Sequence, residues 1–153
     1  MQQGRPLGRL LYDQQFWWAI LVAPLVLLLI SLIAPELPFV IEPTYRQLAL
    51  FLILAPLLEE LAFRGWLQGY FWRTRLARQR VGNISAANIA TSALFALSHT
   101  YSGPLLWSLL VFFPSLVFGY HRDRYQSVFP AFVLHLVYNA CWLTWLLCSG
   151  LNS

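Results

Sequence analysis

Three charged side chains lie inside one long apolar run, and this feature limits the folds open to the chain more than any other. The run extends from Leu48 to Trp72, and its midpoint falls beside Glu59 and Glu60, with Arg64 shortly after them. A charged side chain at the centre of a bilayer costs roughly 2.5 to 3.5 kcal/mol on insertion scales, so such residues pair, line a wet cavity or take part in chemistry. The run therefore predicts a polar site at membrane depth.

Helical geometry separates the expected roles of these charges. Positions four apart stack on one face of a helix, whereas adjacent positions point about 100° apart. Glu60 is therefore expected to pair with Arg64, and Glu59 is expected to remain unpaired, which suits a general base. Pro56 precedes Glu59 in the same run. Because a proline removes one backbone hydrogen bond, we expect a kink and a freed carbonyl there, with room for water beside Glu59.

Composition places the chain among integral membrane proteins. Apolar residue types make up 59% and charged types 10% of the sequence, against about 45 to 50% and about 25% in soluble proteins. A chain of 153 residues is expected to form a single domain, 1–153, with a motif-bearing core at about 45–145. The fold class expected is all-α, a polytopic transmembrane bundle of about five spans. These spans are predicted at 16–34, 48–72, 84–101, 105–120 with an interruption at Pro114, and 128–147.

The basic residues predict the orientation of the chain. All ten are arginines, and they concentrate before the first span, after the second and after the fourth, whereas the opposite side carries only Arg46. Short cytoplasmic loops carry the excess of basic residues, so the N-terminus is predicted in the cytoplasm and the C-terminus outside a bacterial-type inner membrane. The cluster Arg73–Arg80 is interpreted as an anchor against the anionic lipid bilayer, and no nucleic acid is expected as a partner. Asp123 is expected to offset its arginine neighbours in a solvent-exposed loop at 121–124.

Two further pairs of polar or aromatic side chains lie at membrane depth. Phe95 and His99 are four residues apart near the end of the third span, and His135 and Asn139 are four apart in the fifth. A carboxylate and an imidazole on neighbouring helices can remove a proton from water, while imidazole and amide N–H groups can hold an oxyanion. This combination favours hydrolysis of a carbonyl bond. A zinc site is the alternative use of these residues, although no HExxH motif is present and Glu60 is committed to Arg64.

The order and spacing of these residues resemble those of a known family. The segments at 59–65, 95–99 and 135–139 match the EExxxR, FxxxH and HxxxN motifs of the CAAX-processing and bacteriocin-processing (CPBP, Abi) intramembrane proteases. The resemblance implies a membrane endopeptidase in which Glu59 and His99 activate water without a metal or other cofactor. It further implies that His135 and Asn139 stabilise the oxyanion, that Glu60 and Arg64 support the site, and that Phe95 shapes it.

The chain is shorter than the eukaryotic members of that family, and this bears on the expected substrate. A prenylated CAAX protein is therefore less expected than a membrane-embedded or membrane-tethered peptide, a lipoprotein or a C-terminal sorting tag. Two rival functions stay open at this stage. One is a non-catalytic module of the same fold, such as a bacteriocin-immunity or scaffold protein. The other is a proton-coupled transporter, against which the absence of an inverted repeat counts.

Overall fold

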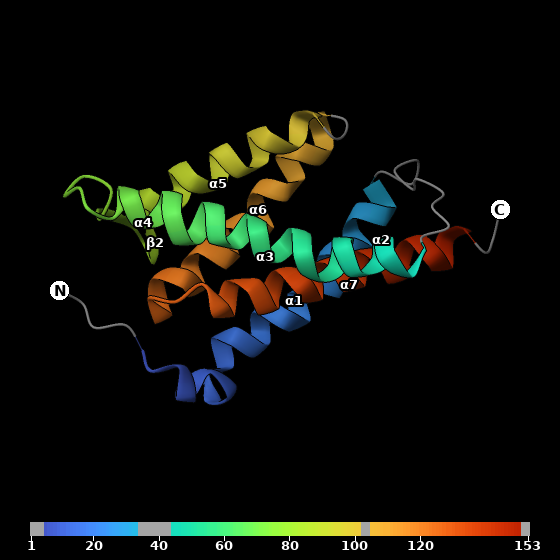
Figure 1. Cartoon of the computed structure of the whole chain (residues 1–153), viewed down its shortest axis with the longest axis horizontal. Coiled ribbons are helices and arrows are strands. Elements are labelled where there is room, and N and C mark those ends of the chain that lie inside the picture. The colour runs from blue at the N-terminus through green and yellow to red at the C-terminus, as the bar shows by residue number, and fades with distance from the viewer. Residues whose placement is uncertain (1–4, 34–43, 102–104, 151–153) are drawn as a thin grey trace.

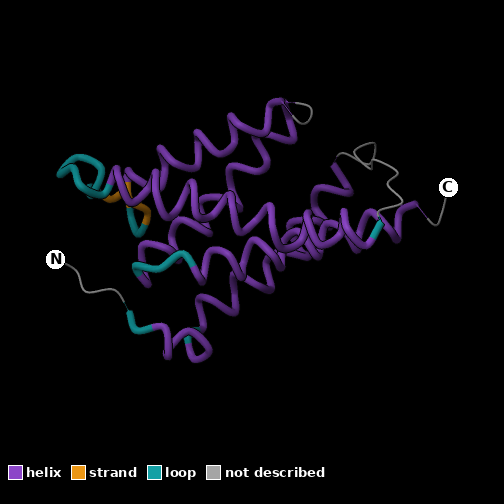
Figure 2. Tube along the Cα trace, in the orientation of Figure 1, coloured by secondary structure: helices purple, strands orange, loops and turns teal. Residues whose placement is uncertain are grey.

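The computed structural model describes residues 5–33, 44–101 and 105–150, which are almost entirely helical (Figures 1 and 2). The 3-10 helix η1 (Leu7–Tyr12) leads into α1 (Gln14–Ile33). A long helix then consists of five consecutive segments, of which η2 and η3 are π-helical: α2 (Tyr45–Ala49), η2 (Leu50–Leu54), α3 (Ala55–Glu60), η3 (Leu61–Leu67) and α4 (Gln68–Phe71). The remaining elements are β1 (Arg80–Val81), β2 (Ile84–Ser85), α5 (Ala86–Ser98), η4 (His99–Tyr101), α6 (Leu105–Tyr125) and α7 (Phe129–Gly150).

Each expected apolar run contains a helix, but several predicted bounds were wrong. The third helix begins at Ala86, because Ile84 and Ser85 form the second strand of a small antiparallel hairpin. Ser85 then caps α5 by accepting a hydrogen bond from the backbone N–H of Asn88. Pro114 does not interrupt the fourth helix, and α6 continues through the predicted loop at 121–124. The sequence also predicts a proline-rich connection at 35–43 and a turn at 102–104, and both lie outside the described residues.

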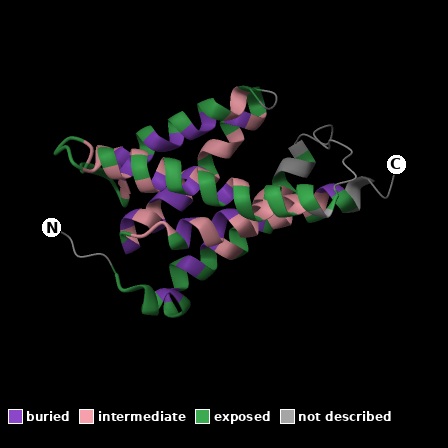
Figure 3. Cartoon of the chain, in the orientation of Figure 1, coloured by how far each residue is buried: buried purple, intermediate pink, exposed green. Residues whose placement is uncertain are grey.

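Two helices in the described part of the chain have the length and apolar composition of a membrane span, Leu105–Tyr125 and Phe129–Leu147, and Gln14–Leu29 is a shorter apolar helix. The side-chain distribution is the reverse of that in a soluble protein. Large apolar side chains such as Leu25 and Phe113 are exposed, whereas many fully buried side chains are polar, among them Gln68 and Asn88. Figure 3 shows the buried residues where helices meet and the exposed ones along their outward sides. Exposed apolar faces of this extent fit a lipid environment.

Close packing of α5 on α6 depends on small and polar side chains. Asn88 donates to the backbone carbonyl of Leu116 over 2.8 Å and accepts from Ser92 over 3.1 Å. Gly119 lies directly beneath it, since a Cβ atom at that position would come within 1.8 Å of the Asn88 Oδ1 atom. Only glycine allows this approach without rearrangement of Asn88, as is usual where membrane helices pack closely.

Asp123 is buried, which contradicts the expectation that it offsets arginines in solvent. It is 5% exposed and accepts hydrogen bonds from Gln68 Nε2 at 2.8 Å, from Trp72 Nε1, from Ser85 Oγ and from Arg122 Nη1 at 3.2 Å. These donors come from α4, the strand β2 and α6 itself. The carboxylate therefore ties together the end of α4, the strand β2 that leads into α5, and the end of α6.

A second carboxylate attaches the beginning of the chain to the end of α6. Asp13 accepts from Arg124 Nε at 2.7 Å and from the Tyr125 hydroxyl at 2.6 Å. Burial alone would raise the pKa of this carboxyl, but the hydrogen bonds from Arg124 and Tyr125 outweigh burial and lower the pKa to about 2. Asp13 thus holds α1 against α6, and α1 in turn packs on α7.

Candidate active site

Glu60 is the centre of a buried polar cluster that joins three helices. Its carboxylate is fully buried, with Oε2 at 3.3 Å from Arg64 Nε and Oε1 at 2.9 Å from His135 Nδ1. The Arg64 side chain, also fully buried, donates from Nη2 to Ser115 on α6 and lies over the Phe95 ring at 5.4 Å. The expected pairing of Glu60 with Arg64 is therefore present. Ser115 was not predicted, because nothing in the sequence around it distinguishes it from a packing serine.

Glu59 has a neighbour that helical geometry did not predict, His135, and the two side chains form an ion pair only when His135 is doubly protonated. Its Oε2 atom lies 3.7 Å from His135 Nε2, and 34% of its side chain is exposed. His135 thus stands between the two glutamates, with one ring nitrogen towards each. A carboxylate oxygen accepts hydrogen bonds, so in this contact His135 donates from Nδ1–H to Oε1 of Glu60. Glu59 is the member of this group that reaches the surface of the protein.

Phe95 brings His99 and His135 together. The Phe95 ring, 2% exposed, lies 4.6 Å from the His99 ring and 5.9 Å from the His135 ring, measured between centroids. On its other side, His135 stacks on Phe118 of α6 at 5.1 Å. The aromatic rings hold both imidazoles in fixed orientations. Phe118 was missed, since an apolar residue in a predicted span carries no distinguishing signal.

The hydrogen bond of His99 determines which of its nitrogen atoms is available. His99 Nδ1 lies 2.9 Å from the carbonyl oxygen of Phe95. A carbonyl oxygen only accepts, so Nδ1 carries the proton and Nε2 of the neutral ring presents a lone pair. The carboxylate of Glu59 also interacts electrostatically with both His99 and His135.

Asn139 lies one turn beyond His135 on α7, and its contact is with a different part of the long helix. Its Nδ2 atom donates to the backbone carbonyl of Phe51 in η2 over 3.2 Å. A side-chain amide nitrogen has two N–H groups, so one remains after this bond. Of the seven predicted site residues, six therefore meet in one contiguous cluster. Asn139 contacts the long helix at Phe51, eight residues before Glu59.

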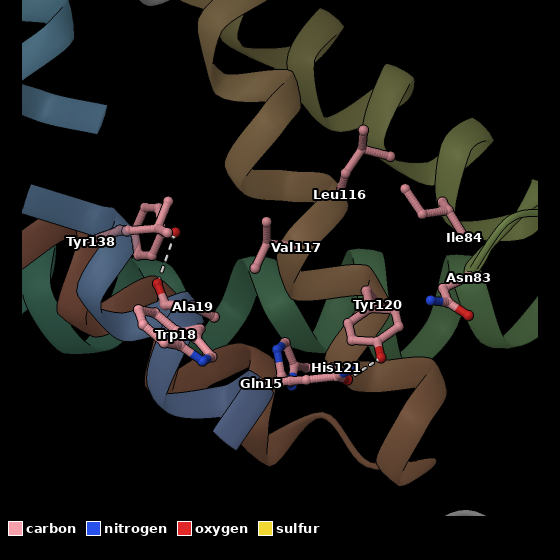
Figure 4. Close-up of a pocket in the computed structure, with 11 residues that line it drawn as sticks. Gln15, Trp18, Ala19, Asn83, Ile84, Leu116, Val117, Tyr120, His121 and Tyr138 are labelled. Carbon is pink, nitrogen blue, oxygen red and sulfur yellow. Dashed lines mark hydrogen bonds between the residues drawn. The ribbon is translucent and has the colours of Figure 1, made fainter. Parts of the chain in front are cut away.

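A pocket of about 370 Å³ lies apart from this cluster, and none of the seven predicted site residues lines it. Figure 4 shows its walls from α1, the hairpin, α6 and α7, with hydrogen bonds between Tyr138 and Ala19 and between Tyr120 and Gln15. His121 lies at its edge, and its buried Nδ1 atom has no hydrogen-bond partner. The pocket is mostly apolar, and the acid and base groups are gathered elsewhere, around Glu60.

The available donor atoms bear on whether the cluster fits a metal ion. Within the described residues, no group of three or more His, Cys, Asp or Glu side chains is arranged to hold one. Both oxygen atoms of Glu60 are engaged, one by Arg64 and one by His135. His99 Nδ1 and His135 Nδ1 are engaged as well, which leaves one nitrogen atom on each ring and the carboxylate of Glu59.

Comparison with known families identifies the chain. A family model described as type II CAAX prenyl endopeptidase Rce1-like matches residues 41–141, well over half of the sequence. Comparisons with curated proteins and with solved structures gave no significant match. The matched region contains all three motifs and every residue of the cluster around Glu60. The helices η1 and α1 precede the matched region. The chain belongs to the Rce1-like family of type II CAAX prenyl endopeptidases.

Proposed function

We propose that this protein is an intramembrane endopeptidase in which Glu59 activates a water molecule for attack on a peptide bond. The observation that carries the proposal is the position of His135, which contacts both Glu59 and Glu60 and shares an aromatic cluster with His99. Family membership supports protease activity of the CAAX type. The glutamic mechanism and the roles of single residues are our proposal.

The proposed reaction begins with a water molecule hydrogen-bonded to Glu59 and to Nε2 of His99. Glu59 takes one proton while the water oxygen attacks the carbonyl carbon of the scissile bond. The electron pair of the carbonyl moves to its oxygen, which accepts hydrogen bonds from the free N–H of Asn139 and from Nε2–H of a doubly protonated His135. The tetrahedral intermediate then collapses, and the Glu59 carboxylic acid returns its proton to the leaving nitrogen. The second proton of the water stays on the new carboxyl group, so the immediate products are one carboxylic acid and one amine. Proton exchange between them gives a carboxylate and an ammonium ion.

Glu60 and Arg64 have a supporting role in this proposal. Glu60 fixes the orientation of His135 through Nδ1, and the positive charge of Arg64 balances the carboxylate. In the doubly protonated form, the imidazole lies between two carboxylates that compensate its charge. Neither Glu60 nor Arg64 is exposed, so neither is proposed to touch the substrate.

The proposed substrate is a peptide segment embedded in or tethered to the membrane, a lipoprotein or a C-terminal sorting tag. Glu59 is half-buried, with 34% of its side chain exposed, and it lies on a helix whose neighbouring residues Leu58 and Leu61 are exposed and apolar. We further propose five spans in a bacterial-type inner membrane, with a cytoplasmic N-terminus, and hydrolysis without a metal ion. The second candidate is a non-catalytic module of the same fold, which fits the polar cluster only as a structural core.

The experiment that tests the proposal compares membrane peptides by mass spectrometry in cells that carry wild-type or Glu59→Gln protein. Removing a general base costs about 10²–10⁴ in rate, so we expect cleavage products that disappear with Glu59→Gln while the amount of inserted protein stays equal. Glu36→Gln is the matched control, because it makes the same chemical change outside the motif region and should leave the products in place. Identical peptide patterns for wild type and Glu59→Gln would favour the non-catalytic module.

A further inference from the structure

The carbonyl group of Phe51 has lost both of the helical hydrogen bonds open to it. In an α-helix it would accept from the N–H of Ala55, but that N–H donates to Leu50 because η2 is π-helical. In the π-helical register it would accept from residue 56. Residue 56 is proline, which has no N–H. The main chain around Phe51 therefore leaves one acceptor without a helical partner.

Asn139 satisfies this acceptor from another helix. Its Nδ2 atom donates to the Phe51 oxygen over 3.2 Å, and because a carbonyl only accepts, the amide must present its nitrogen here and not its oxygen. The bond fixes the amide plane and leaves the second N–H directed elsewhere. Pro56 itself is fully buried and stands five residues after Phe51 and three before Glu59, so the freed carbonyl and the proposed base lie on one continuous helix.

We propose that Pro56 is a positioning residue for catalysis: by withholding its N–H, it keeps the Phe51 carbonyl free to orient the side-chain amide of Asn139. The proposal rests on the proposed function in one respect, the role of Asn139 as a donor to the oxyanion. A residue with an N–H at position 56 competes with Asn139 for the freed carbonyl. The amide of Asn139 then loses its fixed orientation, while the binding of substrate is unaffected.

The kinetic test uses Pro56→Ala, Asn139→Ala and the double variant on a peptide cleaved by the wild-type protein. Losing one oxyanion donor costs about 10²–10³ in kcat, so Pro56→Ala should lower kcat by at least about tenfold with KM unchanged. In the Asn139→Ala background, Pro56→Ala should have no further effect, because the amide it positions is absent. Pro24→Ala is the matched control, since Pro24 also lies inside a helix, α1. A kcat for Pro56→Ala equal to that of the wild type, or effects that multiply in the double variant, would overturn the proposal.

A spectroscopic measurement tests the same contact without any proteolysis. Phe51–Leu52 is the only Phe-Leu sequence in the chain, so labelling with ¹³C-carbonyl phenylalanine and ¹⁵N-leucine gives one unique NMR signal for that peptide group. We expect the ¹³C chemical shift of the Phe51 carbonyl to change in Asn139→Ala and to stay the same in Pro24→Ala. An unchanged shift in Asn139→Ala would show that the contact does not exist and would overturn the proposal even if Pro56→Ala failed to fold. If wild-type protein cleaves nothing, the proposed function fails, and this signal still decides whether the amide is held.

Discussion

At the scale of single residues, the buried Glu60–Arg64 pair carries a clear energetic requirement. Both side chains are fully buried, so removing one partner leaves an uncompensated charge in the interior of the protein. Breaking a buried pair in this way costs about 3–5 kcal/mol. We expect Arg64→Met to lower the free energy of unfolding in detergent by about that amount, and Glu60→Gln added to Arg64→Met to recover part of the loss. A double variant less stable than Arg64→Met would contradict the pairing.

The residues that sequence reasoning placed correctly are those whose partners lie one helical turn away. Glu60 with Arg64 follows from the spacing alone, because the two residues are four apart in a helical run. Glu59 was expected to be unpaired because its neighbour, His135, is far along the chain. Asp123 was misplaced for the same reason, since Gln68 and Ser85 reach it only through the tertiary fold. Long-range partners of buried polar groups leave no local pattern.

At the scale of elements, the contact of α5 with α6 depends on Gly119. A methyl group at this position would overlap the Asn88 side chain, which is itself held by Leu116 and Ser92. Overpacking of this kind costs about 1–3 kcal/mol, so Gly119→Ala should lower the melting temperature in detergent, and Asn88→Ala should relieve the effect. Gly8→Ala is the matched control, because nothing lies within 4 Å of its added methyl group. Equal melting temperatures for Gly119→Ala and Gly8→Ala would contradict the packing.

The attachment of η1 and α1 to the end of α6 predicts a dependence on pH. The pKa of Asp13 is about 2 in the folded protein against an ordinary value of 3.8. Its carboxylate therefore contributes stability above pH 3.8, and the contribution is lost as the pH falls through 2. We expect wild type to exceed Asp13→Asn in thermal stability at neutral pH, and the difference to shrink over this acidic range. A difference that stays constant down to pH 2 would show that the charge of Asp13 has no part in the attachment.

Some elements were missed although the sequence holds a signal for them. Gly82 and Asn83 form the turn between β1 and β2, and Gly82 has a φ of 61°, which favours glycine. A two-residue turn of this composition is a recognised hairpin signal. The π-helical character of η2 and η3 is different, because it depends on which carbonyl each N–H selects within an already helical stretch. Pro56 limits that choice without determining it.

At the scale of the whole molecule, the arginine pattern predicts how the chain crosses the membrane. With five spans, the N-terminus lies in the cytoplasm and the C-terminus outside. Alkaline phosphatase fused to the C-terminus should therefore be active, because the C-terminus is predicted outside the cytoplasm. A fluorescent protein fused at the same place should show no fluorescence. The same pair of reporters at the N-terminus should give the opposite result. A fluorescent C-terminal fusion would contradict the five-span arrangement. It would not bear on the contacts around Glu60.

The helical fold followed from composition, because a membrane requires helices, and the charges in an apolar run made Glu59, Glu60 and Arg64 conspicuous. The five spans stay a prediction, since two helices in the described residues have the length and apolar composition of a span. The way the helices tilt to bring His99 and His135 onto Phe95 did not follow, since it depends on packing along α5, α6 and α7. The same holds for the free amide N–H of Asn139.

The most direct test of the central claim is hydrolysis of one identified peptide by purified protein in H₂¹⁸O, with a metal chelator present throughout. We expect wild-type protein to place one ¹⁸O atom in the new carboxylate, and Glu59→Gln to produce none above background. Cleavage by Glu59→Gln at the wild-type rate, or loss of wild-type activity on chelation that added zinc restores, would contradict an attack by water that Glu59 activates without a metal ion.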